Sequence, residues 1–371
     1  MCTEMRGNRS IGEKIGIIPI LGSLALAIGY SCVMGWVFKY AWMSINGSMY
    51  AMQSNMEVIG STFGQTASAW GANFWIIIAL IASFAIMSMG VSGGIEKANK
   101  IMMPVLFILF VLLGLYIVFQ PGSSGGYKYI FTVNLEGLAN PKIWIYAFGQ
   151  AFFSLSITGS GMIVCGAYLD KKEDIVNGAL QTGIFDTIAA MIAAFVVIPA
   201  SFAFGYPASA GPSLMFMTIP EIFKQMPFGQ LLAILFFVSV VFAAVSSLQN
   251  MFEVVGESII TRFKLSRKAV IFLLAIISLA IGIFIEPENK VGPWMDVVTI
   301  YIIPFGAVLG AISWYWLLKK ESYMEELNLG SKVPRSEIYH TIGKYIYVPL
   351  VLVVFILGVI SVSYTHLRAH E

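Results

Sequence analysis

Long apolar segments separated by short polar loops dominate the chain. A helix needs about 20 apolar residues to cross the hydrocarbon core of a bilayer, and longer segments tilt. We therefore expect an all-α, multi-pass membrane protein with one domain at 1–361 and nine spans, at 16–44, 73–94, 101–120, 143–168, 176–203, 229–261, 267–285, 294–318 and 343–361. Residues 204–228 are also apolar, but their prolines and glycines favour a short re-entrant helix over a tenth span.

One apolar segment, 143–168, is interrupted in its middle by the sequence SLSITGSG at 154–161. Its hydroxyl residues recur at every second position, so a regular helix would place them on two opposite faces. Unwound backbone that lines a water-filled cavity would use both the hydroxyls and the freed carbonyl groups, as broken helices of secondary transporters do. We therefore predict a helix break around Ser156–Gly161 that helps to form a binding site.

Composition supports a membrane protein and argues against other classes. Of the 371 residues, 58% are hydrophobic and only 11% are charged, whereas soluble domains carry about 25% charged residues. The net charge of +2 gives no reason to expect a nucleic-acid partner. The cysteines lack metal or disulfide spacing, and His340 is the only histidine outside the tail, so we expect neither an enzyme nor a cofactor.

Lysine and arginine are concentrated in alternate loops, which predicts the orientation. The loops rich in these residues are the N-terminal segment and those near 97–100, 171–172, 262–268 and 319–344. We expect these loops and the N-terminus to be cytoplasmic, in a protein of the inner (cell) membrane.

The two ends of the chain differ from what an inverted repeat requires. Such transporters have a broken helix in each half, but only one is visible, and counting back from it indicates that the first two helices are missing. The alternative is a protein with a single broken helix and no repeat. The tail at 362–371 carries His366 and His370; a metal-binding pair or a soluble tail is conceivable, but VSYTHLRAHE resembles a translated sequencing adapter, so we treat the tail as non-native.

Polar residues inside the predicted spans are candidates for ion binding. Asp186 lies about ten residues into its span, where a charge costs about 2.5–3.5 kcal/mol, and we favour a function for it over a packing role. Ala243, Ser246 and Ser247 share one helix face and could coordinate a cation, although close helix packing uses the same residues and is favoured by the spacing alone.

Three further residues have competing interpretations. The Tyr30 hydroxyl could face substrate, but a hydrogen bond to a neighbouring helix is the commoner role of such a tyrosine. Leu26 lies one turn earlier, where packing is the commoner role. Asp296 opens a span on the outer side and is either a gate charge or an ordinary carboxylate at a helix start.

The order of these features resembles the neurotransmitter:sodium symporter family, particularly its bacterial amino-acid transporters, from about residue 3 to 361. The most specific motifs are GQAFFSLS followed by a glycine-broken turn and GAYL, the inner loop SGGIEKANKIMMP, and FKLSRK. The resemblance implies an inverted-repeat, leucine-transporter-like fold in which the nine spans are helices three to eleven.

The resemblance also implies roles for individual residues. It implies substrate contacts for Tyr30, Leu26, Phe153, Ser154 and Ser156, with Gly159 in place of a large side chain of the pocket. It implies one sodium site at Ser154 and Asp186, a second at Ala243, Ser246 and Ser247, and an outer gate at Asp296. Ala190 matches the position associated with chloride in some relatives, which argues against chloride coupling.

Sodium-coupled symport of an amino acid is the function that the resemblance implies. The apolar positions Leu26, Ile157, Leu248 and Met251 suggest a hydrophobic or aromatic substrate. The alternative is a proton-coupled carrier or channel-like protein with the same fold, driven through Asp186. Without the helices expected to precede this chain, it should not transport; the sequence does not predict the oligomeric state.

Overall fold

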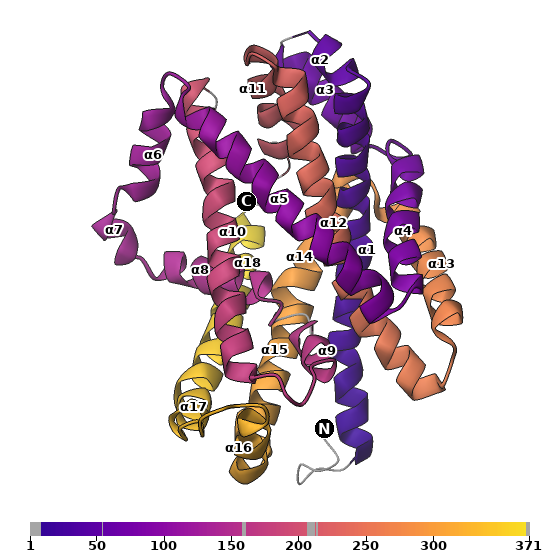
Figure 1. Cartoon of the computed structure of the whole chain (residues 1–371), viewed down its shortest axis with the longest axis vertical. Helices are drawn as coiled ribbons and strands as arrows, with labels where there is room; N and C mark the ends of the chain where they lie inside the picture. Colours follow the sequence, from indigo (N-terminus) through magenta and orange to yellow (C-terminus); the bar gives the residue numbers. More distant parts are fainter. Residues whose placement is uncertain (1–8, 54, 158–160, 206–211, 213, 369–371) are drawn as a thin grey trace.

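The computed structural model describes residues 9–53, 55–157, 161–205, 212 and 214–368, which form helices and loops but no strand (Figure 1). The helices of the first half are α1 (Arg9–Ile45), α2 (Ser48–Ala51), α3 (Met56–Thr66), α4 (Asn73–Ser88), α5 (Glu96–Val118), α6 (Ser123–Phe131), α7 (Leu135–Leu138), α8 (Pro141–Ser154) and α9 (Gly161–Ala167). Those of the second half are α10 (Ile175–Ala203), α11 (Ile219–Gln225), α12 (Gly229–Phe263), α13 (Arg267–Ile285), α14 (Glu288–Asp296), α15 (Ile303–Ile312), α16 (Lys320–Asn328), α17 (Ile338–Ile342) and α18 (Val348–Arg368).

Five π-helical turns adjoin these helices and lengthen several of them. They are η1 (Val91–Ile95), η2 (Leu214–Thr218), η3 (Val297–Ile302), η4 (Ser313–Leu317) and η5 (Gly343–Tyr347). The run from α14 to η4 is one continuous helical segment, and so is the run from α17 through η5 into α18. They begin at Glu288 and Ile338, several residues before the predicted spans at 294–318 and 343–361.

Each of the nine predicted spans corresponds to a helical region of the structure. Seven helical segments are long and apolar enough to cross a membrane. The eighth region, α4, is apolar but shorter. The ninth is the pair α8 and α9, separated by the predicted break. The fold is therefore that of an all-α, multi-pass membrane protein.

Within the apolar stretch at 204–228, residues 214–225 form the π-helical turn η2 and the short helix α11 rather than another span. Phe216, Ile219 and Phe223 are buried in the main hydrophobic core, so this segment folds back onto the protein. In Figure 1, α11 lies at the upper end with α2 and α3, whereas the start of α1, α16 and α17 lie at the lower end.

The main core lies between α1, α4, α5, α12 and α13. The α1 and α12 helices pack against each other along much of their length, and both also pack on α4 and α13 (Figure 1). The α1 helix approaches α4 closely at Gly35, where a Cβ atom would lie only 3.0 Å from the Ile76 nitrogen. Two smaller hydrophobic clusters join α8, α15 and α18, and α1, η3 and α15.

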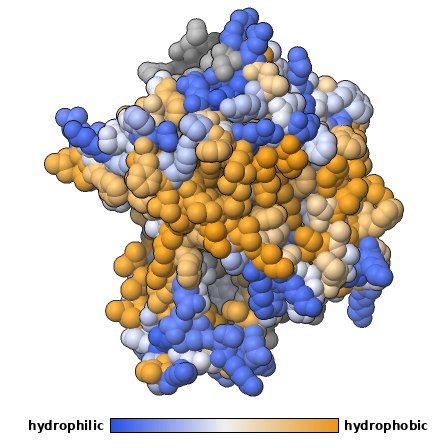
Figure 2. Space-filling view, turned by 45° about the horizontal axis from the view of Figure 1, so that its top comes forward, coloured by the Kyte–Doolittle hydropathy of each residue, from blue (hydrophilic) through white to orange (hydrophobic). Residues whose placement is uncertain are grey.

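The outer surface has the polarity expected of a membrane protein. In Figure 2, a wide band of hydrophobic side chains crosses the middle of the molecule, and hydrophilic residues gather above and below it. Exposed large side chains on this surface include Ile108, Leu115, Leu180 and Phe272. A hydrocarbon environment satisfies such a band, whereas water would not.

Candidate functional site

The predicted helix break lies between α8, which ends at Ser154, and α9, which begins at Gly161. The Ser156 N–H donates to the Phe153 carbonyl and the Ile157 N–H donates to the Phe152 carbonyl, both at 3.0 Å. Ser156 has a φ of 55°, in the left-handed region. This pair of backward hydrogen bonds around a left-handed residue is the Schellman motif, which ends a helix and satisfies its last carbonyls.

Packing supports the same break. Phe152 is buried and Ile157 packs against the hydrophobic cluster to which Phe152 belongs. An apolar contact between these two positions commonly accompanies a Schellman motif. The break is therefore built from local hydrogen bonds and a local apolar contact. Residues 158–160, which include the predicted pocket residue Gly159, lie outside the described residues.

The two predicted members of the first ion site lie together at the break. Ser154 is the last residue of α8, and its Oγ donates a hydrogen bond of 2.6 Å to Oδ1 of Asp186 on α10. Asp186 is half-buried and Ser154 is exposed. A hydroxyl and a carboxylate thus meet beside carbonyl groups at a helix end, and oxygen ligands of this kind suit a hard cation.

The three predicted members of the second ion site lie on one stretch of α12. The Ser246 Oγ donates to the Ala243 carbonyl at 2.9 Å, so two candidate ligand oxygens are adjacent. The Ser247 side chain lies next to the Tyr30 hydroxyl of α1. The predicted substrate tyrosine is therefore next to the predicted sodium-binding serine.

The predicted apolar pocket residues fall into separate groups. Leu26 is buried with Val298 and Ile303, and Met251 packs against the same cluster. Leu248 is fully buried in the main core, and Phe153 is exposed at the end of α8. Ile157 packs against the cluster of α8, α15 and α18, whereas Leu26 and Met251 belong to another cluster.

The predicted gate residue Asp296 is exposed at the end of α14, beside a firm contact with α1. The Trp294 Nε1–H donates to the Ala25 carbonyl at 2.8 Å. Met295 packs on the backbone of α1 at Gly29, where a Cβ atom would collide with its side chain. Asp296 is thus held within a short distance of the Leu26 and Tyr30 segment.

A polar cluster lies at the far end of the broken helix, just after α9, and it was not predicted from the sequence. The Tyr168 hydroxyl, just after α9, lies 2.9 Å from carboxylate oxygens of both Glu253 and Glu257 on α12. Arg267 donates to the two oxygens of Glu253 at 2.8 and 2.7 Å and to the Met87 carbonyl at 3.0 Å. The sequence offered one signal, the spacing of the two glutamates on one helix face, but not their partners.

The described residues contain no group of three or more His, Cys, Asp or Glu side chains that could hold a metal ion. The candidate ion ligands are instead hydroxyls, carbonyls and one carboxylate. Such a set is weak for transition metals, which prefer imidazole and thiolate, and suits an alkali or alkaline-earth cation.

Several relatives match this chain over most of its length. The sodium-dependent transporter YhdH of Bacillus subtilis is 28% identical over 369 residues, which cover 95% of this chain and 81% of the relative. The transporter MJ1319 of Methanocaldococcus jannaschii is 33% identical over 302 residues, which cover 76% of this chain and 58% of the relative. A transporter of Haemophilus influenzae is 28% identical over 274 residues; the match covers 73% of this chain and 60% of that relative. All three are described as uncharacterized sodium-dependent transporters.

A solved structure and a family profile agree with these relatives. The crystal structure of MhsT in complex with L-phenylalanine matches with a TM-score of 0.82 and 27% identity, covering 92% of this chain and 80% of MhsT. The fold is thus the leucine-transporter-like fold expected from the sequence. The profile of the sodium:neurotransmitter symporter family matches residues 49–370. The chain therefore belongs to the sodium:neurotransmitter symporter family.

Proposed function

We propose that the complete protein carries an amino acid across the cell membrane together with sodium. The observation that carries this proposal is the hydrogen bond between Ser154 and Asp186 at the end of a broken helix. It joins a hydroxyl and a carboxylate beside the end of a broken helix, in a family of sodium-dependent transporters.

Sodium would occupy two sites in this proposal. One would use Ser154 and Asp186 with carbonyls of the break, and the other would use the Ala243 carbonyl with the hydroxyls of Ser246 and Ser247. The adjacency of the Ala243 and Ser246 oxygens supports the second site, because a cation can bind both without a rearrangement of α12. Asp186 would also supply a negative charge that makes chloride unnecessary, since Ala190, one turn later, has no polar side chain.

The amino acid would lie between Tyr30 and the break. The proximity of the Tyr30 hydroxyl to Ser247 supports this position, because one residue belongs to the predicted substrate site and the other to the predicted ion site. Leu26 and Met251, which share a hydrophobic cluster, would contribute to an apolar pocket for a hydrophobic or aromatic side chain. MhsT, whose solved structure contains L-phenylalanine, supports the same class of substrate.

Transport in proteoliposomes tests the proposal. We expect uptake of phenylalanine, leucine or tryptophan by the complete protein to follow an inward sodium gradient and to stop when choline replaces sodium. Uptake that ignores sodium and follows a pH gradient would instead establish proton coupling through Asp186.

Two variants test the ion sites. Asp186→Ala and Ser247→Ala should each raise the sodium concentration for half-maximal uptake about tenfold or more, because the loss of a ligand to a charge costs about 1.5–3 kcal/mol. Thr182→Ala is the matched control, since its hydroxyl is exposed on α10 and bonds only its own helix at the Gly178 carbonyl. Sodium titrations like that of the control for both variants would contradict the assignment.

A further inference from the structure

The seven residues 168–174, which we call the inner linker, join the broken helix to α10 and are held at both ends. At the first end, Tyr168 contacts Glu253 and Glu257 of α12. At the second end, Asp174 contacts Arg335 in the loop between α16 and α17. The two attachments differ in strength, and this difference determines how the linker can move.

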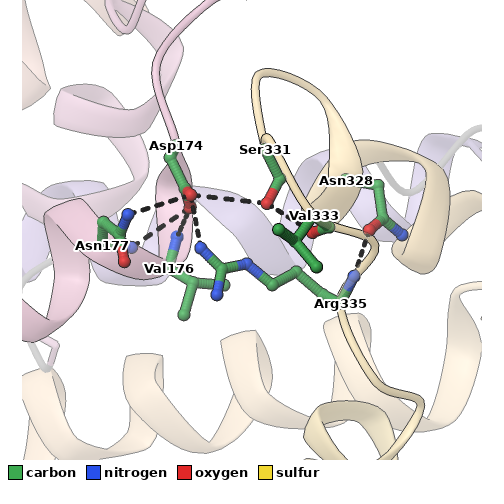
Figure 3. A network of polar contacts seen from close by, with 7 residues as sticks. All are labelled: Asp174, Val176, Asn177, Asn328, Ser331, Val333 and Arg335. Carbon is green, nitrogen blue, oxygen red and sulfur yellow. Dashed lines mark hydrogen bonds and ion pairs between the residues drawn. The ribbon is translucent and has the colours of Figure 1, made fainter.

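The attachment at Asp174 uses many donors at once (Figure 3). Its carboxylate caps α10 by accepting from the N–H groups of Val176 at 3.1 Å and Asn177 at 3.2 Å. It also accepts from the Asn177 side chain at 3.1 Å and from the Arg335 guanidinium. The Ser331 Oγ lies 3.4 Å away, but its single proton has a nearer acceptor in the Val333 carbonyl at 2.9 Å. The Asp174 and Arg335 side chains are only 17% and 21% exposed, so water competes weakly for this ion pair.

The loop at 328–335 is shaped to receive the linker. Its two ends are joined by the Arg335 N–H, which donates to Oδ1 of Asn328 at 2.6 Å (Figure 3). Gly330 has a φ of 77° and lies flat on the linker, where a Cβ atom would be 2.5 Å from the Glu173 carbonyl oxygen. Only glycine combines this backbone conformation with so close a contact. The backbones of the loop and the linker are therefore packed directly on each other.

Electrostatics favour the same attachment over a wide pH range. Burial raises the pKa of Asp174, but the Asn177 N–H and the Arg335 guanidinium lower it further, so that the net pKa lies below its ordinary value. The Asp174 carboxylate therefore remains charged to a lower pH than an unpaired aspartate, and the ion pair with Arg335 persists with it.

The attachment at Tyr168 is weaker than that at Asp174 because it has a single hydrogen-bond donor. A tyrosine hydroxyl has one proton, so it can donate to Glu253 or to Glu257 but not to both. Glu253 is already engaged by Arg267 through both of its oxygens. Tyr168 is also 41% exposed, which lets water replace either contact.

We propose that the contact between Asp174 and Arg335 is a fixed pivot of the transport cycle. The linker detaches from α12 at Tyr168 and turns about Asp174, while the loop at 328–335 moves together with the start of α10. Arg335 is thus a positioning residue for α10 and for Asp186 on it. The inference rests on the proposed function, because it assumes that α8, α9 and α10 move relative to α12 during transport.

Cross-linking separates a pivot from a contact that must open. In the double variant Asp174→Cys and Ser331→Cys, a short bifunctional reagent that forms disulfides with both thiols cross-links the linker to the loop at 328–335. In the double variant Tyr168→Cys and Glu257→Cys, the same reagent cross-links the linker to α12. Cys2 and Cys165 are replaced by serine, whereas Cys32 is buried. We expect the joined pivot to retain sodium-driven uptake of phenylalanine in proteoliposomes, and the joined Tyr168 end to lose it until a reductant is added. Loss of uptake that a reductant restores in the Asp174 and Ser331 pair would overturn the pivot.

Spin-label distances give a readout that leaves both attachments intact. Labels at Lys171 and Lys332 span the pivot, and labels at Lys171 and Lys268 span the Tyr168 end; all three lysines are exposed. Distances are measured with sodium alone and with sodium and phenylalanine. We expect the distance between Lys171 and Lys332 to be the same in both conditions, and the distance distribution between Lys171 and Lys268 to differ between them. A change in both pairs would refute the pivot alone, whereas no change in the second pair would refute the proposed function and the pivot with it.

Arg335 variants complete the test through conformation rather than folding. Arg335→Ala should broaden the Lys171 to Lys332 distance distribution, and Arg335→Lys should restore much of it, because the charge remains while the planar fork is lost. A narrow distribution in Arg335→Ala would show that the ion pair does not hold the loop.

Discussion

The break between α8 and α9 depends on the backbone of one residue. Ser156 adopts a left-handed conformation, which costs a residue with a side chain about 1 kcal/mol relative to glycine. Ser156 is therefore strained where the helix ends. The strain is compensated by the two backward hydrogen bonds and by the packing of Ile157.

The strain predicts opposite effects of two substitutions. Ser156→Gly should raise the melting temperature in detergent, and Ser156→Val should lower it, because a β-branched side chain disfavours positive φ more strongly. A thiol-reactive dye follows unfolding through Cys32, which is fully buried in the folded protein, in a Cys165→Ser background. A lower melting temperature for Ser156→Gly than for the parent would contradict the left-handed conformation.

Gln249 is a second residue with a measurable cost. It is fully buried on α12, and neither atom of its amide group has a hydrogen-bond partner in the described part of the protein. An unsatisfied buried polar group costs about 1–3 kcal/mol. Gln249→Leu should therefore raise the melting temperature. Asn250→Leu, at the exposed neighbouring position, is the control and should change it little; a loss of stability confined to Gln249→Leu would show that its amide is satisfied.

The sequence pattern singled out individual candidate residues, and the family resemblance paired some of them, but most tertiary neighbours could not be predicted. The Ser154 hydroxyl and Asp186 could be proposed because both are polar interruptions of apolar spans. The position of Ile157 could not, because the cluster against which it packs also contains residues of α15 and α18, far along the chain. The same is true of Arg267, which lies in a polar loop and reaches back to Glu253.

At the scale of elements, the existence of the helices was predictable and their ends were less so. Apolar length identifies a span because a bilayer requires it. It does not identify a helix end that extends into polar residues, such as the start of α14 at Glu288 or of α17 at Ile338. There the helix is continued by its own backbone hydrogen bonds and by tertiary packing, which hydropathy does not measure.

The packing of α1 on α4 predicts a position-specific effect of alanine. Gly35→Ala would place a Cβ atom 3.0 Å from the Ile76 backbone nitrogen, which is closer than a methyl group normally approaches. The two helices must therefore separate, at a cost of about 1–3 kcal/mol. Gly16→Ala is the matched control on the same helix, because nothing lies near its Cβ position. Thermal unfolding should show a lower melting temperature for Gly35→Ala only. Equal melting temperatures would mean that α1 and α4 are less closely packed.

At the scale of the whole molecule, charge predicts which end faces the cytoplasm. One end of the protein carries the start of α1 together with α16 and α17 (Figure 1). The segments next to these helices are rich in lysine and arginine. Positively charged loops are retained on the cytoplasmic side. We therefore expect this end to face the cytoplasm and the end with α2, α3 and α11 to face outward.

Two matched cysteine variants test this orientation. Lys332→Cys and Lys290→Cys replace exposed lysines, one in the loop at 328–335 and one at the start of α14, which are predicted to lie on opposite sides. In intact cells with Cys2 and Cys165 replaced by serine, a membrane-impermeant maleimide should label Lys290→Cys, and it should label Lys332→Cys only after permeabilisation. The reverse pattern would invert the topology.

The Schellman motif at the end of α8 has a consequence for the kinetics of ion capture. Because the motif closes itself through Phe152 and Phe153, the interruption exists before any ion arrives. The loss of chain entropy that accompanies such a bend is incurred when the polypeptide folds. An arriving ion therefore has no helical turn to melt, and its association should be a single rapid phase with little dependence on temperature.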